Sequence, residues 1–82
     1  MTLEALKNAN RVIGIKQAAK AVKRGSAQEV FIAEDAEARV TEPLMALCEE
    51  KQVPVNKAVT MQELGTACGI EVGAAAAAVI GQ

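Results

Sequence analysis

The chain has 82 residues, about half of them apolar, and a net charge of −1 at pH 7. This length suits one domain, and the apolar content argues against intrinsic disorder. The absence of histidine excludes Ser-His and Cys-His catalytic pairs and histidine-ligated zinc, and a single aromatic residue, Phe31, excludes folds that stack bases on several aromatic side chains.

The first third of the chain predicts a short helix near Leu3–Asn8 and a brief strand at Arg11–Ile13. Gly14 separates this strand from a helix predicted from residue 15 to residue 24, and Gly25 ends the helix. The helix is indicated by apolar residues spaced at i, i+3, i+4 and i+7, which form one core-facing side: Ile15, Ala18, Ala19 and Val22.

The middle of the chain predicts a buried strand at Glu29–Ala33, an acidic loop over 34–37 and then a helix that ends near Lys51. Thr41 is expected to be the N-cap of this helix, with Pro43 in its first turn. Its inner side is expected to consist of Val40, Leu44, Leu47 and Cys48.

In the last third, Val53-Pro54-Val55 leads into a predicted strand that ends about Ala58. A short helix follows, which begins with the capping-box sequence Thr60-Met61-Gln62-Glu63 and can be closed by Gly69. The final segment, Gly73 to Ile80, is ambiguous. Alanine favours helix slightly by propensity, yet a short apolar run between glycines also fits a strand buried on both faces. The alternation of helices and strands predicts an α/β domain with helices covering a mixed sheet.

Two cysteines, Cys48 and Cys68, match no metal or redox spacing, and we expect reduced thiols packed as small apolar side chains. No signal peptide is visible, and the longest uncharged segment, Val72 to Gln82, is too short to span a membrane, so a cytoplasmic location is expected. No nucleophile–base pair, metal-ligand set or G-x-x-x-x-G-K loop is present, which predicts a non-catalytic protein without cofactor or metal.

The charges are unevenly distributed along the chain. Residues 5–28 contain six basic residues and no acidic one: Lys7, Arg11, Lys16, Lys20, Lys23 and Arg24. Residues 29–50 contain seven acidic residues against Arg39 alone: Glu29, Glu34, Asp35, Glu37, Glu42, Glu49 and Glu50. A protein with such a distribution can present a basic face to nucleic acid while its net charge stays near zero.

The helix that follows Gly14 is the first candidate for a binding site. A glycine before a helix lets the chain turn sharply, and the free N–H groups and positive end of the helix suit phosphate. Lys16 and Gln17 lie in the first turn, where they can reach base edges, and Lys20 extends the positive strip. The alternative is an ordinary solvated helix face.

The second candidate is the loop Ile70-Glu71-Val72-Gly73, which follows a glycine-rich segment. It presents two apolar residues around one acid, an arrangement that could support bases pushed out of a stack. The alternative is a loop whose apolar residues pack into the core.

These two segments, together with two further ones, resemble the L-seven-Ae ribosomal-protein family over about residues 10–80, and in particular its small bacterial members of the YbxF type. The motifs that carry the resemblance are Gly14-x-Lys16-Gln17-x-x-Lys20-Ala21-x-x-Arg24-Gly25, Ala33-Glu34-Asp35-Ala36, Leu47-Cys48-Glu49-Glu50-Lys51 and Leu64-Gly65-x-Ala67-x-Gly69-Ile70-Glu71-Val72. The resemblance implies a three-layer α-β-α sandwich around a four-stranded mixed sheet, with Ala74 to Ile80 as a central strand.

The resemblance also implies one kink-turn-binding domain over residues 1–82. A kink-turn is an RNA internal loop in which a short bulge precedes tandem sheared G·A pairs. The Lys16-Gln17 pair stands where archaeal and eukaryotic relatives have Asn-Glu. The expected partner is ribosomal RNA or a riboswitch, bound by a monomer, with no DNA or membrane partner. The expected RNA-binding residues are Gly14, Ile15, Lys16, Gln17, Lys20, Lys23, Arg24, Ile70, Glu71, Val72 and Gly73.

Two alternatives stay open. One is a structural ribosomal module that does not recognise isolated kink-turns. The other is a protein-interaction module whose acidic face, Glu34 to Glu50, meets a basic partner.

Overall fold

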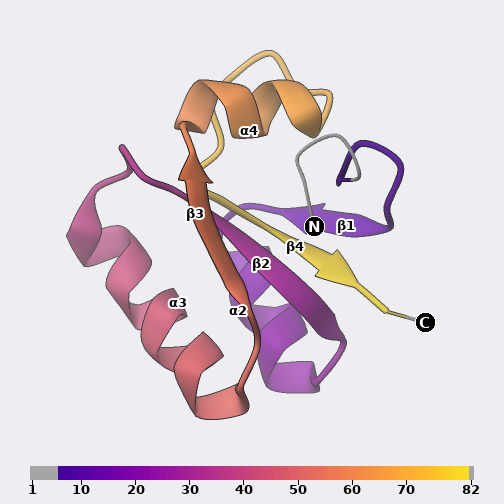
Figure 1. Ribbon diagram of the computed structural model, residues 1–82, viewed down its shortest axis with the longest axis vertical. Helices are drawn as coiled ribbons and strands as arrows, with labels where there is room; N and C mark the ends of the chain where they lie inside the picture. The colour runs from indigo at the N-terminus through magenta and orange to yellow at the C-terminus, as the bar shows by residue number, and fades with distance from the viewer. Residues whose placement is uncertain (1–5, 82) are drawn as a thin grey trace.

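The computed structural model describes residues 6–81 (for residue 58 the backbone alone), so residues 3–5 of the helix expected near Leu3–Asn8 lie outside them. Helices and strands alternate along the chain (Figure 1): β1 (Arg11–Ile13), α2 (Ile15–Arg24), β2 (Ala27–Ala33), α3 (Ala38–Lys51), β3 (Val55–Val59), α4 (Met61–Ala67) and β4 (Ala76–Ile80). The predicted bounds of β1 and α2 are confirmed, whereas β2 begins at Ala27 rather than Glu29 and β3 runs to Val59.

The four strands form one mixed sheet in the order β1-β4-β2-β3. β4 pairs antiparallel with both neighbours, and β2 pairs parallel with β3. The last segment is therefore a central strand, as the family resemblance implied, and the helix favoured by local propensity is wrong. Ala76, Ala77 and Ala78 are completely buried, so both faces of β4 gain from burial and this outweighs the helix preference of alanine.

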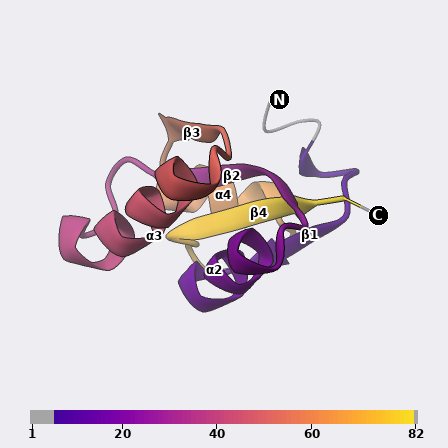
Figure 2. The same cartoon turned by 90° about the horizontal axis from the view of Figure 1, so that it is seen from below.

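Side chains of the central strands alternate between two cores on opposite faces of the sheet. On one face, Val30 and Ala78 pack with α2 and α3, which lie beside each other. On the other face, Phe31 and Ala77 pack with α4. The helices thus enclose the sheet in a three-layer α-β-α sandwich, as expected, and Figure 2 shows α2 running alongside β4.

The start of α3 differs from the prediction. The helix begins at Ala38, so Thr41 is not its N-cap; Thr41 is buried, and its Oγ1 donates a hydrogen bond to the Ala38 carbonyl at 3.3 Å. Pro43 therefore lies inside the helix, where its missing N–H removes one backbone hydrogen bond. Burial of Thr41 and Leu44 holds this turn against the sheet, and Val40, expected on the inner side, is 42% exposed.

Candidate nucleic-acid interface

The two candidate segments lie at the same end of the sheet. Because β1 and β4 are antiparallel, the last residue of β1, Ile13, pairs with Ala77 near the first residue of β4. The Gly14 N–H donates to the Ala76 carbonyl at 2.8 Å. The start of α2 therefore lies beside the end of the loop that connects α4 to β4 (Figure 1).

The start of α2 leaves its backbone donors open. Gly14 precedes it with φ 102° and ψ 158°, and no side chain caps the helix. The first helical hydrogen bond runs from the Ala18 N–H to the Gly14 carbonyl at 2.9 Å, so the N–H groups of residues 15–17 have no helical acceptor. With Lys16 and no acidic residue in the first turn, this helix end carries a positive potential that suits an anion.

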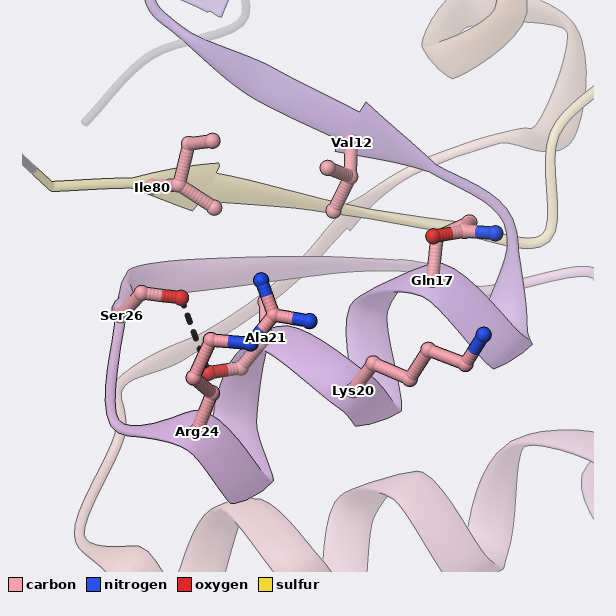
Figure 3. Close-up of a pocket in the computed structure, with 7 residues that line it drawn as sticks. All are labelled: Val12, Gln17, Lys20, Ala21, Arg24, Ser26 and Ile80. Atoms are coloured by element: carbon pink, nitrogen blue, oxygen red, sulfur yellow. Dashed lines mark hydrogen bonds between the residues drawn. The ribbon is translucent and has the colours of Figure 1, made fainter.

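The polar residues of α2 that were predicted to contact RNA lie on its outer side. Lys16, Gln17, Lys20, Lys23 and Arg24 are all exposed. Ile15, the other residue expected in the first turn of the site, is partly buried and packs against the α2–α3 core. A small hollow of about 60 Å³ borders one side of the helix (Figure 3).

The loop that connects α4 to β4 is held closely against α4. The Ile70 N–H donates to the Gly65 carbonyl at 3.0 Å, and the Ala74 N–H donates to the Met61 carbonyl at 3.1 Å. A Cβ atom at Gly65 would lie 2.1 Å from the Val72 carbonyl oxygen, so this close approach requires glycine.

The predicted loop residues do not share one environment. Ile70 packs against the α4 core, as the structural alternative expected, whereas Val72 is 70% exposed, as the binding interpretation expected. Glu71 and Gly73 are also exposed. The loop therefore presents one apolar side chain, Val72, from a backbone that α4 anchors at both ends.

Arg11 belongs to the basic first third of the chain, but its guanidinium is engaged in hydrogen bonds within the protein. Its Nη2 donates to the Cys68 carbonyl at 3.0 Å, and its Nη1 donates to carbonyls of the preceding turn, including that of Ala9 at 3.2 Å. Arg11 thus ties β1 to the end of α4, directly before the loop. Sequence spacing gave no signal for this, because the two residues are far apart in the chain.

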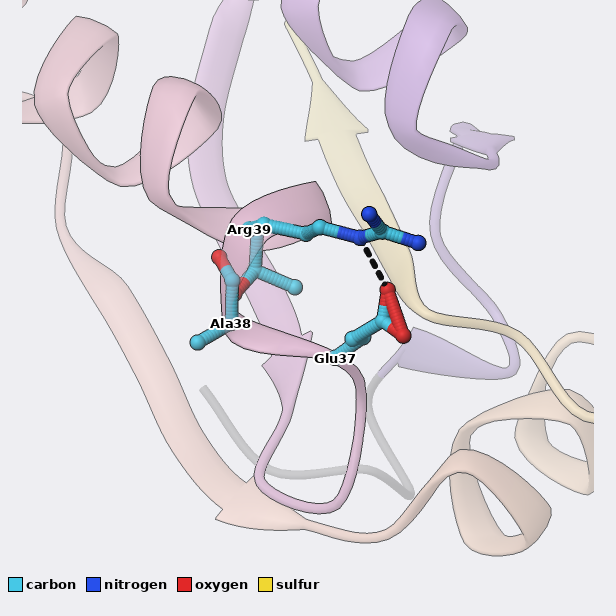
Figure 4. A network of polar contacts seen from close by, with 4 residues as sticks. Glu37, Ala38 and Arg39 are labelled. Atoms are coloured by element: carbon cyan, nitrogen blue, oxygen red, sulfur yellow. Dashed lines mark hydrogen bonds and ion pairs between the residues drawn. The ribbon is translucent and has the colours of Figure 1, made fainter.

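The acidic loop after β2 is partly engaged in structural contacts. The Asp35 carboxylate accepts a hydrogen bond from the Met61 N–H at 2.8 Å, so it supports the start of α4. Glu37 pairs with Arg39 on the surface (Figure 4), where both side chains are exposed and solvent weakens the ion pair. These contacts give the loop a structural role that needs no basic partner.

The two cysteines pack as small apolar side chains, as expected. Cys48 and Cys68 are free and buried, and burial raises the pKa of each thiol, with Arg11 partly opposing the rise in the pKa of Cys68. Within residues 6–81, no cluster of three or more potential ligands could hold a metal ion. No helix in this part of the chain has the length and apolar character needed to cross a bilayer.

The fold is that of a three-layer sandwich with an open helix start and an anchored loop at one end of its mixed sheet. The model of the ribosomal protein L7Ae/L30e/S12e/Gadd45 family matches residues 2–82, and the chain belongs to this family.

Its relatives include small bacterial proteins of nearly the same length. It is 49% identical to the RNA-binding protein YbxF of Geobacillus stearothermophilus over 84% of each chain, and 44% identical to an RNA-binding protein of Geobacillus sp. (strain WCH70) over 94% of each chain. Among solved structures, the 15.5kD RNA binding protein of Giardia lamblia superposes with a TM-score of 0.88 at 31% identity, covering 98% of this chain and 71% of that one.

Proposed function

We propose that this chain is a single, non-catalytic RNA-binding domain that recognises kink-turn internal loops. The observation that carries the proposal is the open, positively charged start of α2 beside the anchored loop with exposed Val72, both at one end of the sheet. Family membership and relatives named as RNA-binding proteins support RNA as the partner. The natural target is ribosomal RNA or a riboswitch that contains the motif, bound by one copy of the chain.

The geometry suits a bent RNA better than a regular helix. A-form RNA has a deep, narrow major groove that side chains cannot read. A kink-turn opens this groove beside its G·A pairs, where the first turn of α2 can enter. The free N–H groups of this turn would meet phosphate oxygens, while Lys16 donates to guanine O6 and N7 and Gln17 both donates and accepts.

The loop supplies the second half of the site. Nucleotides in the bulge of a kink-turn are unstacked and expose apolar base faces to water. Val72 offers an apolar surface against which such a base can pack, and the hydrogen bonds of Ile70 and Ala74 to α4 fix its position. Because the loop is anchored, it loses little conformational entropy when RNA binds, so a single valine can contribute to the binding affinity.

A titration with two RNAs tests the proposal. The first RNA contains a kink-turn, and the second is the same stem with Watson–Crick pairs in place of the G·A pairs. We expect the protein to prefer the kink-turn, and the Lys16→Ala/Gln17→Ala double variant to lose about 1–3 kcal/mol for each good base contact. Lys57→Ala serves as the charge control, since Lys57 is exposed on β3 at the opposite edge of the sheet from β1. Unchanged affinity of the double variant, or equal binding of both RNAs, would refute kink-turn recognition.

A further inference from the structure

The hollow beside α2 has a polar rim and an apolar floor. It lies on the side of the helix that faces the edge strand β1 and its neighbour β4 (Figure 3). The rim is made by Gln17, Lys20, Arg24 and Ser26. The floor is made by Val12, Ala21 and Ile80. Among residues 6–81, no acidic side chain lines it.

The exposed polar residues of α2 differ in whether they border the hollow. Gln17, Lys20 and Arg24 stand at i, i+3 and i+7, and all three border the hollow. Lys16 and Lys23, which stand four residues before and three residues after Lys20, do not border the hollow. Lys23 and Arg24 are therefore neighbours in sequence with equal charge and different surroundings.

The chemistry of the hollow fits a unit of nucleic-acid backbone. Its volume of about 60 Å³ exceeds the roughly 10–15 Å³ that one water molecule needs, so there is room for a tetrahedral anion. The guanidinium of Arg24 can bind a phosphate with two hydrogen bonds, and Lys20 adds a second positive charge. Val12 and Ile80 offer an apolar surface to the carbon face of a ribose.

We propose that this hollow is a second RNA contact, which takes one phosphate and its ribose from the stem that runs along α2. The inference rests on the proposed function, because the first turn of α2 must first place the RNA along the helix. It assigns a backbone contact to Arg24 and none to Lys23. Base recognition at the helix start and backbone binding in the hollow are then separate contributions to affinity.

The matched pair Arg24→Gln and Lys23→Gln tests this assignment. Both residues are exposed in the last turn of α2, so each substitution removes one charge and the same favourable helix-dipole interaction. We expect Arg24→Gln to weaken kink-turn binding about tenfold, as for one charge-assisted hydrogen bond, and to reduce the slope of log K against log salt by about one. Lys23→Gln should weaken binding less than about twofold, as expected for a screened surface charge. Equal effects of the two variants would overturn the assignment.

Chemically modified RNA locates the phosphate. Kink-turn RNAs are prepared with one neutral 2′-deoxy methylphosphonate at successive stem positions, each compared with a 2′-deoxy phosphate control. At one position the wild-type protein should lose about as much affinity as Arg24→Gln does, and there the variant should lose nothing further, because the same contact is already missing. Additive losses at every position would overturn the inference.

The outcomes separate this inference from the proposed function. Kink-turn recognition depends on the wild-type preference for the kink-turn over the Watson–Crick stem. If that preference is absent, kink-turn recognition fails, and the two variants are then compared on the Watson–Crick stem. A larger loss for Arg24→Gln there still supports a backbone site in the hollow, and equal losses reject it.

Discussion

Two helices of this protein, α2 and α4, begin at the same end of the sheet. The first N–H groups of α4 are capped by side chains, whereas those of α2 are not. At the start of α4, Thr60 and Glu63 form a reciprocal capping box, with hydrogen bonds of 3.1 and 2.9 Å, and the Asp35 carboxylate accepts from the Met61 N–H. At the start of α2, Gly14 offers no side chain and Lys16 occupies the first turn.

Core packing holds both helices, since each is too short to be stable alone. α2 has 10 residues and buries Ala18, Ala21 and Val22, and α4 has 7 residues and buries Leu64, Gly65 and Ala67. A cap adds only about 1 kcal/mol to such burial. The core therefore allows α2 to leave its first N–H groups free for a ligand.

The largest expected effect comes from placing an acidic residue in the first turn of α2, which makes its start resemble that of α4. We expect Lys16→Glu to abolish kink-turn recognition, because it removes a base contact of about 1–3 kcal/mol and adds repulsion from phosphate. The same change should raise the free energy of unfolding by about 0.3–1 kcal/mol, because a negative charge favours a helix N-terminus. Gel-shift titration and chemical denaturation measure the two effects.

Lys23→Glu provides the control for this prediction. It makes the same change of charge at the other end of α2, where the helix dipole has the opposite sign, so it should lower the free energy of unfolding by a similar amount. If both variants are destabilised, the start of α2 is not the electrostatically open site described above.

Gly65→Ala tests the loop half of the site. The added Cβ would lie 2.1 Å from the Val72 carbonyl oxygen, so the loop or α4 must move. We expect a loss of roughly 1–3 kcal/mol in the free energy of unfolding, as for an overpacked core, and weaker RNA binding because Val72 is displaced. Thr66→Ala, an adjacent exposed position on α4, should change stability by less than about 0.5 kcal/mol. Full RNA affinity in a folded Gly65→Ala protein would show that the position of Val72 is unimportant.

Thr60→Ala makes the start of α4 more like that of α2. Loss of the capping box should lower the free energy of unfolding by about 1 kcal/mol, measured by thermal or chemical denaturation, whereas Gln62→Ala in the same turn should have little effect. RNA affinity should not rise, since α4 has Glu63 in its first turn and no lysine there. A gain in RNA affinity would mean that an open helix start alone is enough for binding.

Local sequence patterns predicted those elements whose signals are local. The apolar spacing of α2, the glycines on either side of it and the Thr60–Glu63 box all act within a few residues, and the structure contains each of them. The start of α3 was misplaced because Thr41 and Pro43 have the composition of a helix start, while burial of Thr41 against the core lies outside any local rule.

Long-range contacts account for what sequence patterns missed in the site. The hydrogen bond from Arg11 to Cys68 and that from Met61 to Asp35 join residues far apart in the chain, so neither spacing nor composition reveals them. The strand β4 was predicted by family resemblance alone, because its alanines favour a helix until the sheet buries both of their faces. The hollow beside α2 likewise requires Val12 and Ile80 to meet the helix from two different strands.

The smallest expected effect comes from Asp35→Asn. It should be opposite to that of Lys16→Glu both for the free energy of unfolding and for RNA affinity. Asp35→Asn keeps the size of the side chain and removes the negative charge near the Met61 N–H, so the free energy of unfolding should fall by about 0.3–1 kcal/mol. Asp35 also lies at the sheet end that contains the start of α2, because the Ala33 N–H bonds to the Ala75 carbonyl. Removing its charge should therefore raise RNA affinity slightly at low salt, and the gain should disappear at high salt because mobile ions screen the charge. Denaturation and RNA titrations at two salt concentrations measure both effects. A loss of RNA affinity would instead mean that the start of α4 helps to position the RNA site through the loop at 70–73.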